Sequence, residues 1–403
     1  MPNLESIIIG GGQAGLAMGR CLVEHQIHHV ILERGRIAER WRSERWDSLR
    51  LLTPNFLSRL PHWRYEEDDP DGYMTVSEVI AYLDAYAQSF NAPILTGMTV
   101  KSLARSQTGF IVKTGSQDWQ ASTVVIATGH CDTPFVPEIA THLNSDILQL
   151  TSSQYRNPNQ LTAGGVLVVG AGASGLQIAE ELMRAGRSVT IAVGRHRRRP
   201  RQYRERDILW WVDKMGIFHQ PADSHTERCF PAPQLVGSDE GRSLDLGILQ
   251  SAGVKLVGRI AAIDNYRVSF ESNLNQVITQ AEQEMQQLLA SIDHYAIAHN
   301  LKGTSTCPKT ISPCPPPKDL NLQHHTIRTV IWATGYRRKY PWLELDLLDQ
   351  QGEIRHIQGI TEEPGLYVLG LRRQRHNSSN FIGGVGDDAM FLAEHLSHYL
   401  RQS

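Results

Sequence analysis

The sequence predicts a three-layer α/β protein made of two nested Rossmann-like domains. Two apolar runs, Ile7–Ile9 and Val166–Val169, each lead into a GxGxxG motif and then into a helical pattern. Each helix is followed by another apolar run, which completes a βαβ unit. Two further apolar runs end in the same Ala-Thr-Gly triplet, at 127–129 and 333–335. The chain therefore repeats one architecture about 160 residues apart.

The first unit has every feature of a dinucleotide site. Gly10 allows a tight turn, Gly12 lets the backbone approach a diphosphate, and Gly15 lets the helix pack closely on the strand. Glu33 stands at the end of the second strand, eighteen residues beyond Gly15, where it can accept hydrogen bonds from ribose hydroxyls. A glycine turn without a nucleotide is the alternative.

The second unit, with Gly170, Gly172 and Gly175, has a basic run in place of the acid. Arginine forms strong, often bidentate bonds to phosphate, so Arg195, with Arg197 or Arg198, is predicted to bind the 2′-phosphate of NADPH. A solvated basic turn and an RNA-binding patch are alternatives. The net charge of −2 favours NADPH over RNA.

Two dinucleotide sites in one chain imply two cofactors that exchange electrons, and FAD with NADPH is the natural pair. The FAD domain is predicted to comprise residues 1–155 and 326–403. The NADPH domain, with a helical insertion near 272–300, takes residues 156–325. The reason is that the second Ala-Thr-Gly strand and the Gly-Asp-Asp-Ala turn at 386–389 are expected to lie with the flavin.

Composition excludes several classes of protein. With 41% hydrophobic and 20% charged residues, the chain is an ordinary globular protein without nucleic acid as a partner. No apolar run approaches the roughly 18 residues of a membrane span, and no secretory signal is visible, so we expect a cytoplasmic protein. The five cysteines form no CxxC or CxxxxC pair, which excludes reductases with an internal dithiol. No metal site is predicted among the 17 histidines.

The whole chain resembles the class B flavoprotein monooxygenases, especially their YUCCA-like and bacterial CzcO-like members. The segment Trp46–Pro61 is similar to the stretch that passes the flavin ring in that branch, and Trp41 and Arg42 correspond to residues near the flavin. The resemblance also implies that Asp387 or Asp388 binds flavin ribityl or phosphate groups. Together, motifs and resemblance assign cofactor binding to Gly10, Gly12, Gln13, Ala14, Gly15, Glu33, Arg34, Trp41, Arg42, Leu49, Thr53, Ala127, Thr128, Gly129, Gly170, Gly172, Ala173, Ser174, Gly175, Arg195, Arg197, Arg198, Ala333, Thr334, Gly335, Gly370, Asp387 and Asp388.

The family fingerprint before the second glycine motif is altered in this chain. Aligned on Tyr155, the sequence has Ser145, Ile147 and Thr151 where the family has Phe, Gly and His. The tyrosine argues against the Baeyer–Villiger subclass. The missing histidine predicts weaker coupling between bound NADP and oxygenation.

The resemblance implies an NADPH-dependent, FAD-containing monooxygenase that oxygenates a small organic substrate with O2 through a flavin C4a-(hydro)peroxide. The cofactor carries the difficult chemistry, so no catalytic side chain is predicted. Two alternatives remain: a reductase that passes electrons to a quinone or protein acceptor, and a flavoprotein without turnover. The oligomeric state, monomer or homodimer, is open.

Overall fold

The first sheet is built around parallel strands from both ends of the chain. The computed structural model describes residues 3–221, 233–238, 240–304 and 308–402. Five strands run in the order β5-β2-β1-β8-β25 and are all parallel. They are β1 (Asn3–Ile9), β2 (His29–Leu32), β5 (Ile94–Leu95), β8 (Asp118–Ile126) and β25 (Leu366–Val368). Antiparallel strands extend the sheet: β6 (Val100–Ser106), β7 (Gly109–Thr114), β23 (His356–Ile357) and β24 (Ile360–Thr361).

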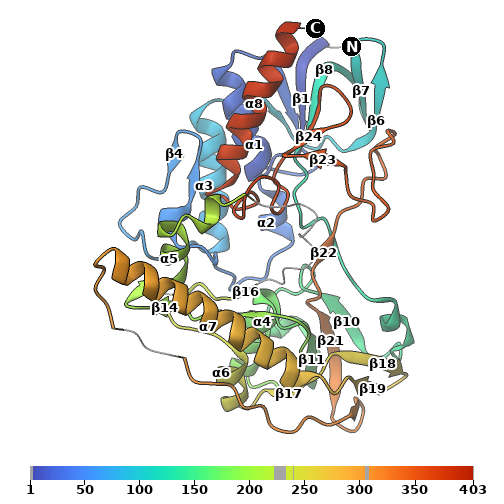
Figure 1. The fold of residues 1–403 in the computed structure, drawn as a ribbon. Coiled ribbons are helices and arrows are strands. Elements are labelled where there is room, and N and C mark those ends of the chain that lie inside the picture. Colours follow the sequence, from blue (N-terminus) through green and yellow to red (C-terminus); the bar gives the residue numbers. More distant parts are fainter. Residues whose placement is uncertain (1–2, 222–232, 239, 305–307, 403) are drawn as a thin grey trace.

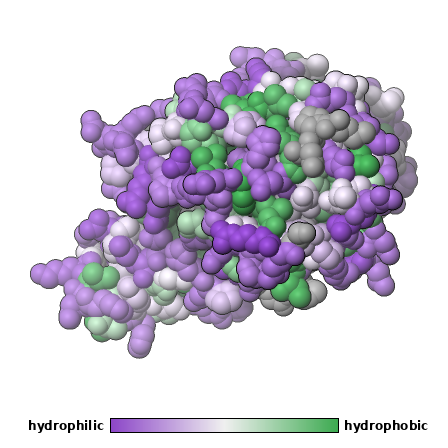
Figure 2. Space-filling model, turned by 90° about the horizontal axis from the view of Figure 1, so that it is seen from above, coloured by the Kyte–Doolittle hydropathy of each residue, from purple (hydrophilic) through white to green (hydrophobic). Residues whose placement is uncertain are grey.

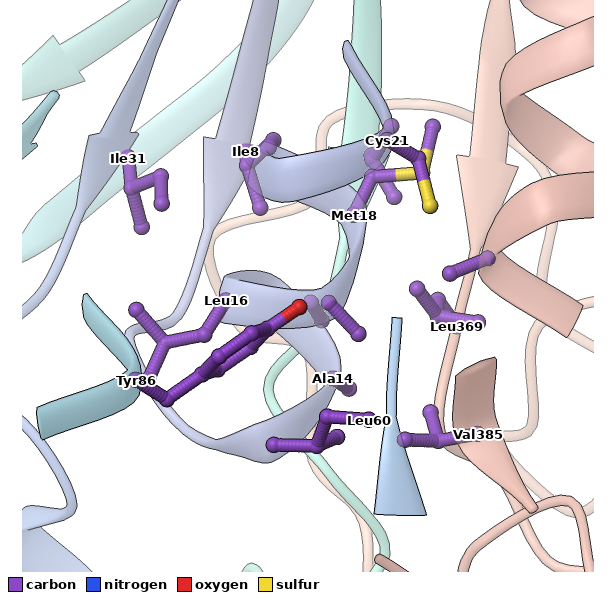
Figure 3. Close-up of a cluster of buried hydrophobic side chains, with 14 of the residues drawn as sticks. Ile8, Ala14, Leu16, Met18, Cys21, Ile31, Leu60, Tyr86, Leu369 and Val385 are labelled. Atoms are coloured by element: carbon purple, nitrogen blue, oxygen red, sulfur yellow. The ribbon is translucent and has the colours of Figure 1, made fainter. Parts of the chain in front are cut away.

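Helices α1 (Gln13–Glu24) and α8 (Val385–Gln402) pack side by side on one face of this sheet (Figure 1). Helix α3 (Val76–Ser89) lies beside them and begins with a capping box between Thr75 and Glu78. The apolar sides of these helices meet the sheet in one core, where Leu16, Tyr86 and Val385 are almost fully buried (Figure 3). This core fixes the start of α1 and α8, and both helix starts border the first candidate site.

The second sheet has five parallel strands in the order β10-β21-β11-β12-β17. Helices α4 (Ala173–Arg184) and α6 (Leu246–Ser251) pack on it through a second core. The strands are β10 (Leu148–Thr151), β11 (Gly165–Val169), β12 (Val189–Ala192), β17 (Lys255–Val257) and β21 (Ile327–Trp332). Two nested Rossmann-like domains, as predicted, thus make up the chain.

An insertion follows β12 and lies between the two sheets (Figure 1). Its helix α5 (Ile208–Lys214) packs against the long α7 (Leu274–Ala298), which confirms the helix predicted near 272–300. A three-stranded antiparallel sheet of β18 (Ile260–Asp264), β19 (Arg267–Phe270) and β20 (Asp319–Asn321) flanks the second domain. The remaining elements are short: α2 (Glu39–Ser43), β3 (Arg59–Leu60), β4 (Trp63–Arg64), β9 (Thr133–Pro134), β13 (Arg197–Arg198), β14 (Gln202–Tyr203), β15 (Arg206–Asp207), β16 (Pro233–Gln234) and β22 (Tyr336–Arg337).

The sheets divide the chain differently from the predicted boundaries at 155 and 326. Strand β10 belongs to the second sheet, although residues 1–155 were assigned to the first domain. Strand β21 also belongs to the second sheet, between β10 and β11, so the second Ala-Thr-Gly triplet does not lie with β25 and α8. The physical reason is that each Ala-Thr-Gly strand pairs with the glycine-motif strand of its own domain: β8 with β1, and β21 with β11.

The end of the molecule where the two termini lie is mostly hydrophilic (Figure 2). Large apolar side chains that are exposed, such as Val23, Ile297 and Ile357, come from different elements. Scattered apolar residues of this kind are normal for a protein surface. Within the described ranges, no helix is both long enough and apolar enough to cross a membrane.

Candidate dinucleotide sites

The first glycine motif forms an open cradle at the carboxyl end of β1. Gly10 has a φ of +115°, and the amide of Gly10 donates to the Leu32 carbonyl at 2.9 Å. A Cβ on Gly15 would lie 1.8 Å from the Gly10 carbonyl oxygen, so only glycine lets α1 start this close to the strand. A Cβ on Gly12, in contrast, would meet nothing within 4 Å. Open space therefore lies where a diphosphate is expected to approach the backbone.

The start of α1 fits an anion. Gly12 caps the helix and no side chain accepts from its first amides, so these amides are available to a ligand. Gln13 donates to the carbonyl of Asn380 at 3.0 Å, and Gly370 approaches the Ala14 side chain. The C-terminal segment thus borders the same cradle. These residues fit the diphosphate of a dinucleotide such as FAD.

Glu33 is fixed by the backbone at the rim of this cradle. The side chain accepts from the amide of Gly11 at 2.6 Å and from the amide of Gly35 at 2.8 Å. A carboxylate held in this position can accept from ribose hydroxyls, as the sequence predicts. Its neighbour Arg34 is half exposed and lies 3.7 Å from Glu44.

The four residues expected near the flavin from the resemblance have different surroundings. Trp41 packs against both cores, with Arg45 stacked on its ring. Arg42 is held by Asp84 at 2.5 Å. Leu49 is buried in the second core, where Trp46 and Tyr155 also lie. Thr53 lines a small pocket between the domains, together with Leu57, Arg59, Asp213, Phe218, His219, Ser378, Phe381 and Gly383.

The first Ala-Thr-Gly triplet closes the cradle from the neighbouring strand. The Ala127 carbonyl would lie 2.6 Å from a Cβ on Gly10, which explains the glycine there. Thr128 is half-buried, and Gly129 has a φ of +78° with nothing near its absent side chain. His130 follows directly, and its Nε2 lies 3.5 Å from the Asn380 amide nitrogen. Sequence reasoning missed both His130 and Asn380. The position of His130 directly after the Ala-Thr-Gly triplet could have marked it, whereas no motif marks Asn380.

Asp387 and Asp388, at the start of α8, have opposite surroundings. The Asp387 side chain is 45% exposed and lies 3.6 Å from His219. Asp388 is fully buried, 3.5 Å from Arg375 and 3.4 Å from His376. Burial raises the pKa of Asp388 to about 6, against the opposing effects of a Ser379 hydrogen bond and the Arg375 charge. Asp387 is therefore the accessible carboxylate of the pair, while Asp388 sits within the fold.

The second glycine motif repeats the same geometry. Gly170 has a φ of +116° and lies against the Ala333 carbonyl, while a Cβ on Gly175 would lie 2.0 Å from the Gly170 oxygen. Gly172 caps α4 without any side-chain hydrogen bond, so the first amides, beside Ala173 and Ser174, are also available. Thr334 donates to the Phe135 carbonyl, and Gly335 has open space around it. This second Ala-Thr-Gly triplet therefore completes the second cradle, not the FAD cradle as predicted.

The basic run after β12 divides into two groups of arginines. Arg198 is buried between two carboxylates, Asp245 at 2.6 Å and Glu282 still closer. These contacts occupy its guanidinium, so Arg198, contrary to the prediction, does not face a phosphate. Arg197 and Arg199 are the alternate residues along this extended segment, and side chains two apart lie on the same side. Arg199 was not predicted, and its position two residues after Arg197 is the signal that could have found it.

The altered fingerprint leads into β10. Ser145 is exposed, Ile147 is buried among apolar side chains, and Thr151 is bonded to Gln154 at 3.0 Å. Tyr155 is fully buried and donates to Glu181 of α4 at 2.6 Å. These residues hold the entry to the second domain in place.

Cysteine and histidine chemistry is sparse at these sites. Cys21, Cys131 and Cys314 are free, whereas Cys229 and Cys307 lie outside the described residues. Burial raises the pKa of Cys21 to about 12, so this thiol stays protonated at neutral pH. In the part of the chain that the structure describes, no cluster of three or more His, Cys, Asp or Glu residues could hold a metal ion.

Comparison with known families agrees with this geometry. Residues 7–213 match the model of the pyridine nucleotide-disulphide oxidoreductase family. The chain belongs to this family. A CzcO-like oxidoreductase of Geobacillus kaustophilus is 34% identical over 402 residues, covering 98% of this chain and 99% of that protein. YUCCA1 of Arabidopsis thaliana, a probable indole-3-pyruvate monooxygenase, is 34% identical over 192 residues, or 46% of each chain.

Solved structures show the same fold. A flavin-containing monooxygenase of Stenotrophomonas maltophilia aligns with a TM-score of 0.67 at 20% identity, covering 99% of both chains. A bacillithiol disulfide reductase of Staphylococcus aureus aligns with a TM-score of 0.62 at 14% identity, covering 98% of both. The relatives and neighbours fit the class B flavoprotein monooxygenases, which confirms the predicted resemblance. The relative that matches 98% of this chain is named an oxidoreductase, and those that match just under half of it are named monooxygenases.

Proposed function

We propose that this protein uses NADPH and O2 to oxygenate a small organic substrate, with FAD in the first cradle and NADPH in the second. The observation that carries the proposal is the pair of uncapped helix starts behind Gly12 and Gly172. The two cradles differ in charge, since Glu33 borders the first and an arginine segment follows the second. This difference suits a ribose hydroxyl in one site and an extra phosphate in the other.

The flavin, when bound, would supply the transfer of electrons from NADPH to oxygen. The amides at the start of α1 would hold its diphosphate, and Glu33 its ribose. The start of α8, with exposed Asp387, borders the pocket lined by Thr53 and Phe381, where the family resemblance puts the flavin ring. Helix starts favour negative charge, so α8 would stabilise a reduced, anionic ring. The buried side chains around this pocket would exclude water.

Two features favour oxygenation over disulfide reduction. The sequence has no CxxC or CxxxxC pair to relay electrons to a disulfide. Relatives that match just under half of the chain are named as indole-3-pyruvate monooxygenases, whose substrates are small organic molecules. We therefore propose a small-molecule substrate for this chain as well, and we extend the proposal to a cytoplasmic location.

The test is a balance of NADPH, O2 and product with the FAD-loaded protein and a panel of small organic compounds. A monooxygenase consumes NADPH and O2 in equal amounts and puts label from ¹⁸O2 into the product, and hydrogen peroxide accounts for the turnover that yields no product. NADPH oxidation that continues without O2, with a quinone as acceptor, would identify a reductase instead. No NADPH oxidation with any acceptor would identify a flavoprotein without turnover.

A further inference from the structure

A short segment of the insertion is bonded to the second glycine motif. Strand β16 lies beside the start of α4 and pairs in parallel with β13 (Figure 1). The side-chain amide of Gln234, in β16, donates to the carbonyl oxygen of Ala171 at 3.0 Å. Ala171 stands between Gly170 and Gly172 of the motif. A side chain 63 residues away along the chain therefore holds the backbone of the second cradle.

The bonded carbonyl belongs to the same peptide unit as the amide of Gly172. A peptide unit is planar and trans, so its carbonyl and its N–H point in opposite directions. Gln234 holds one side of this unit, and the Gly172 amide is directed to the other side. Gly172 caps α4, and no described residue accepts from its amide. The Gln234 bond therefore sets the direction of an amide that is available to a diphosphate.

The first cradle holds its equivalent peptide unit in the same way. There the carbonyl of Gly11, which precedes the cap residue Gly12, accepts from the backbone amide of Ala38 at 3.3 Å. In both cradles a donor behind the motif thus fixes the carbonyl that comes before the helix cap. The donor is a backbone amide in the first cradle and a side chain in the second, so a substitution can remove only the second.

Gln234 is itself fixed on several sides. Its side chain is 0% exposed, and the next residue, Leu235, packs in the core of the insertion with Trp211 and Met285. The Leu235 carbonyl accepts from Gln177 of α4 at 3.0 Å. The Oε1 atom of Gln234 is buried and has no hydrogen-bond partner, so the contact made by this side-chain amide is the one to Ala171. A side chain held this firmly can hold a carbonyl in one direction without further loss of entropy.

We propose that Gln234 is a positioning residue for NADPH: by holding the Ala171 carbonyl, it keeps the Gly172 amide directed at the diphosphate. The inference rests on the proposed function, since it needs a dinucleotide in the second cradle. The diphosphate is common to NADPH and NADH, so Gln234 determines the affinity for both and not the preference between them. The packing of the insertion thereby contributes to the affinity of the cofactor site.

The experiment measures the Kd of NADP⁺ and of NAD⁺ for the oxidised, FAD-loaded protein by calorimetry. Gln234→Met keeps the length of the side chain and removes both the donor and the unpartnered Oε1 atom, so the two effects on stability offset each other. Both Kd values are expected to rise by the same factor, about threefold to tenfold, the effect of one lost hydrogen bond. FAD content is expected to stay normal, because the first cradle has its own donor in Ala38.

Gln177→Met is the matched control. The Gln177 amide also donates to a buried carbonyl at 3.0 Å, in the same segment but outside the glycine motif. This variant is expected to leave both Kd values nearly unchanged. Thermal unfolding of both variants shows that they are folded and compares their stability.

Gln234→Glu tests the donor itself, because an ionised carboxylate only accepts hydrogen bonds and a protonated carboxyl group can donate. Burial raises the pKa of a carboxyl group, so protonation at this position is expected within the stable range of the protein. The Kd of NAD⁺ for this variant, divided by the wild-type value, is expected to fall as the pH is lowered from about 8 to about 5. The same ratio for Gln234→Met is expected to stay constant.

Unchanged Kd values in folded Gln234→Met protein, or an equal rise in Gln177→Met, would overturn the proposal. A rise confined to NADP⁺ would also overturn it, because the effect would then belong to the 2′-phosphate. Wild-type protein that binds neither nucleotide would instead refute the proposed function.

Discussion

The Arg201 guanidinium and the Asp207 carboxylate meet at 2.6 Å in the insertion, and Arg201 is 0% exposed. Both also bind the first domain: Arg201 donates to the Leu52 carbonyl at 2.8 Å, and Tyr73 donates to Asp207 at 2.6 Å. A buried ion pair stabilises a structure only when its remaining donors and acceptors are also satisfied. Here Leu52 and Tyr73 of the other domain supply two of those partners, so the pair links the insertion to the FAD domain.

Tyr73→Phe is expected to weaken this contact without creating a cavity. Loss of one hydrogen bond to a buried carboxylate should lower the free energy of unfolding by about 1–3 kcal/mol. Denaturant unfolding followed by tryptophan fluorescence measures the change. Tyr65→Phe is the matched control, because the Tyr65 hydroxyl lies at the surface, 3.5 Å from Glu67. Equal effects of the two variants would show that the Tyr73 contact does not stabilise the domain arrangement.

The arginines after β12 are expected to separate into stability and selectivity residues. Arg198→Ala leaves Asp245 and Glu282 without their buried partner, so it should cost about 3–5 kcal/mol of stability. Arg199→Ala removes a buried cation near Arg197 and should not destabilise the protein. Steady-state kinetics with NADPH and NADH should show reduced NADPH preference for Arg199→Ala only. A similar loss of preference in Arg198→Ala protein that remains folded would contradict this division.

Two glycines of the first cradle are expected to respond differently to alanine. In Gly15→Ala, the added methyl meets the Gly10 carbonyl, and neither backbone can move away cheaply, so the fold itself is destabilised. In Gly12→Ala, the methyl enters open space, so the FAD-free protein should unfold at the wild-type temperature. The same methyl should reduce FAD binding, because it occupies the path of the diphosphate. Thermal unfolding of the FAD-free variants checks the two stability predictions, and flavin titration checks FAD binding by Gly12→Ala. Strong FAD binding by this variant would argue against the cradle as the FAD site.

Local motifs in the sequence were sufficient to predict the two cradles. Gly15 is required by its contact with Gly10 in the same motif, and Gly10 by its contact with Ala127, which the first Ala-Thr-Gly triplet marks in the sequence. The domain boundaries could not be predicted in this way. Whether Ile327–Trp332 pairs with β8 or with β11 depends on strand order, and both strands end in an apolar run, so hydrophobicity does not decide between them. The repeated Ala-Thr-Gly triplet contained the answer. One copy follows each glycine motif along the chain, which indicates that each domain has its own copy.

The roles of individual side chains were the least predictable part. Arg197, Arg198 and Arg199 look identical in sequence, and their difference arises from Asp245 and Glu282, 47 and 84 residues beyond Arg198. Asp387 and Asp388 are likewise adjacent, yet the helix turns one toward His219 and the other into the core. Such distinctions depend on packing between distant segments, which motif reading does not include.

Asp388 provides a test that depends on pH. Burial raises the pKa of Asp388 from 3.8 to about 6, so the folded protein holds a proton that the unfolded chain releases between these values. Stability from this group therefore falls as pH rises from about 4 to 6 and stays lower above that range. Since one pKa unit corresponds to about 1.4 kcal/mol, the loss is on the order of 3 kcal/mol. Asp388→Asn removes the titration, so the variant should gain stability relative to wild type as pH rises.

The measurement is denaturant unfolding of FAD-free wild type and Asp388→Asn at several values from about pH 3.5 to pH 8, a range that spans the expected transition. Asp387→Asn is the matched control, because Asp387 is the exposed neighbour on the same helix turn. The difference in unfolding free energy between wild type and Asp388→Asn should change with pH, and the Asp387→Asn difference should change much less. A constant difference for Asp388→Asn would mean that Arg375 and His376 keep this carboxylate ionised despite its burial.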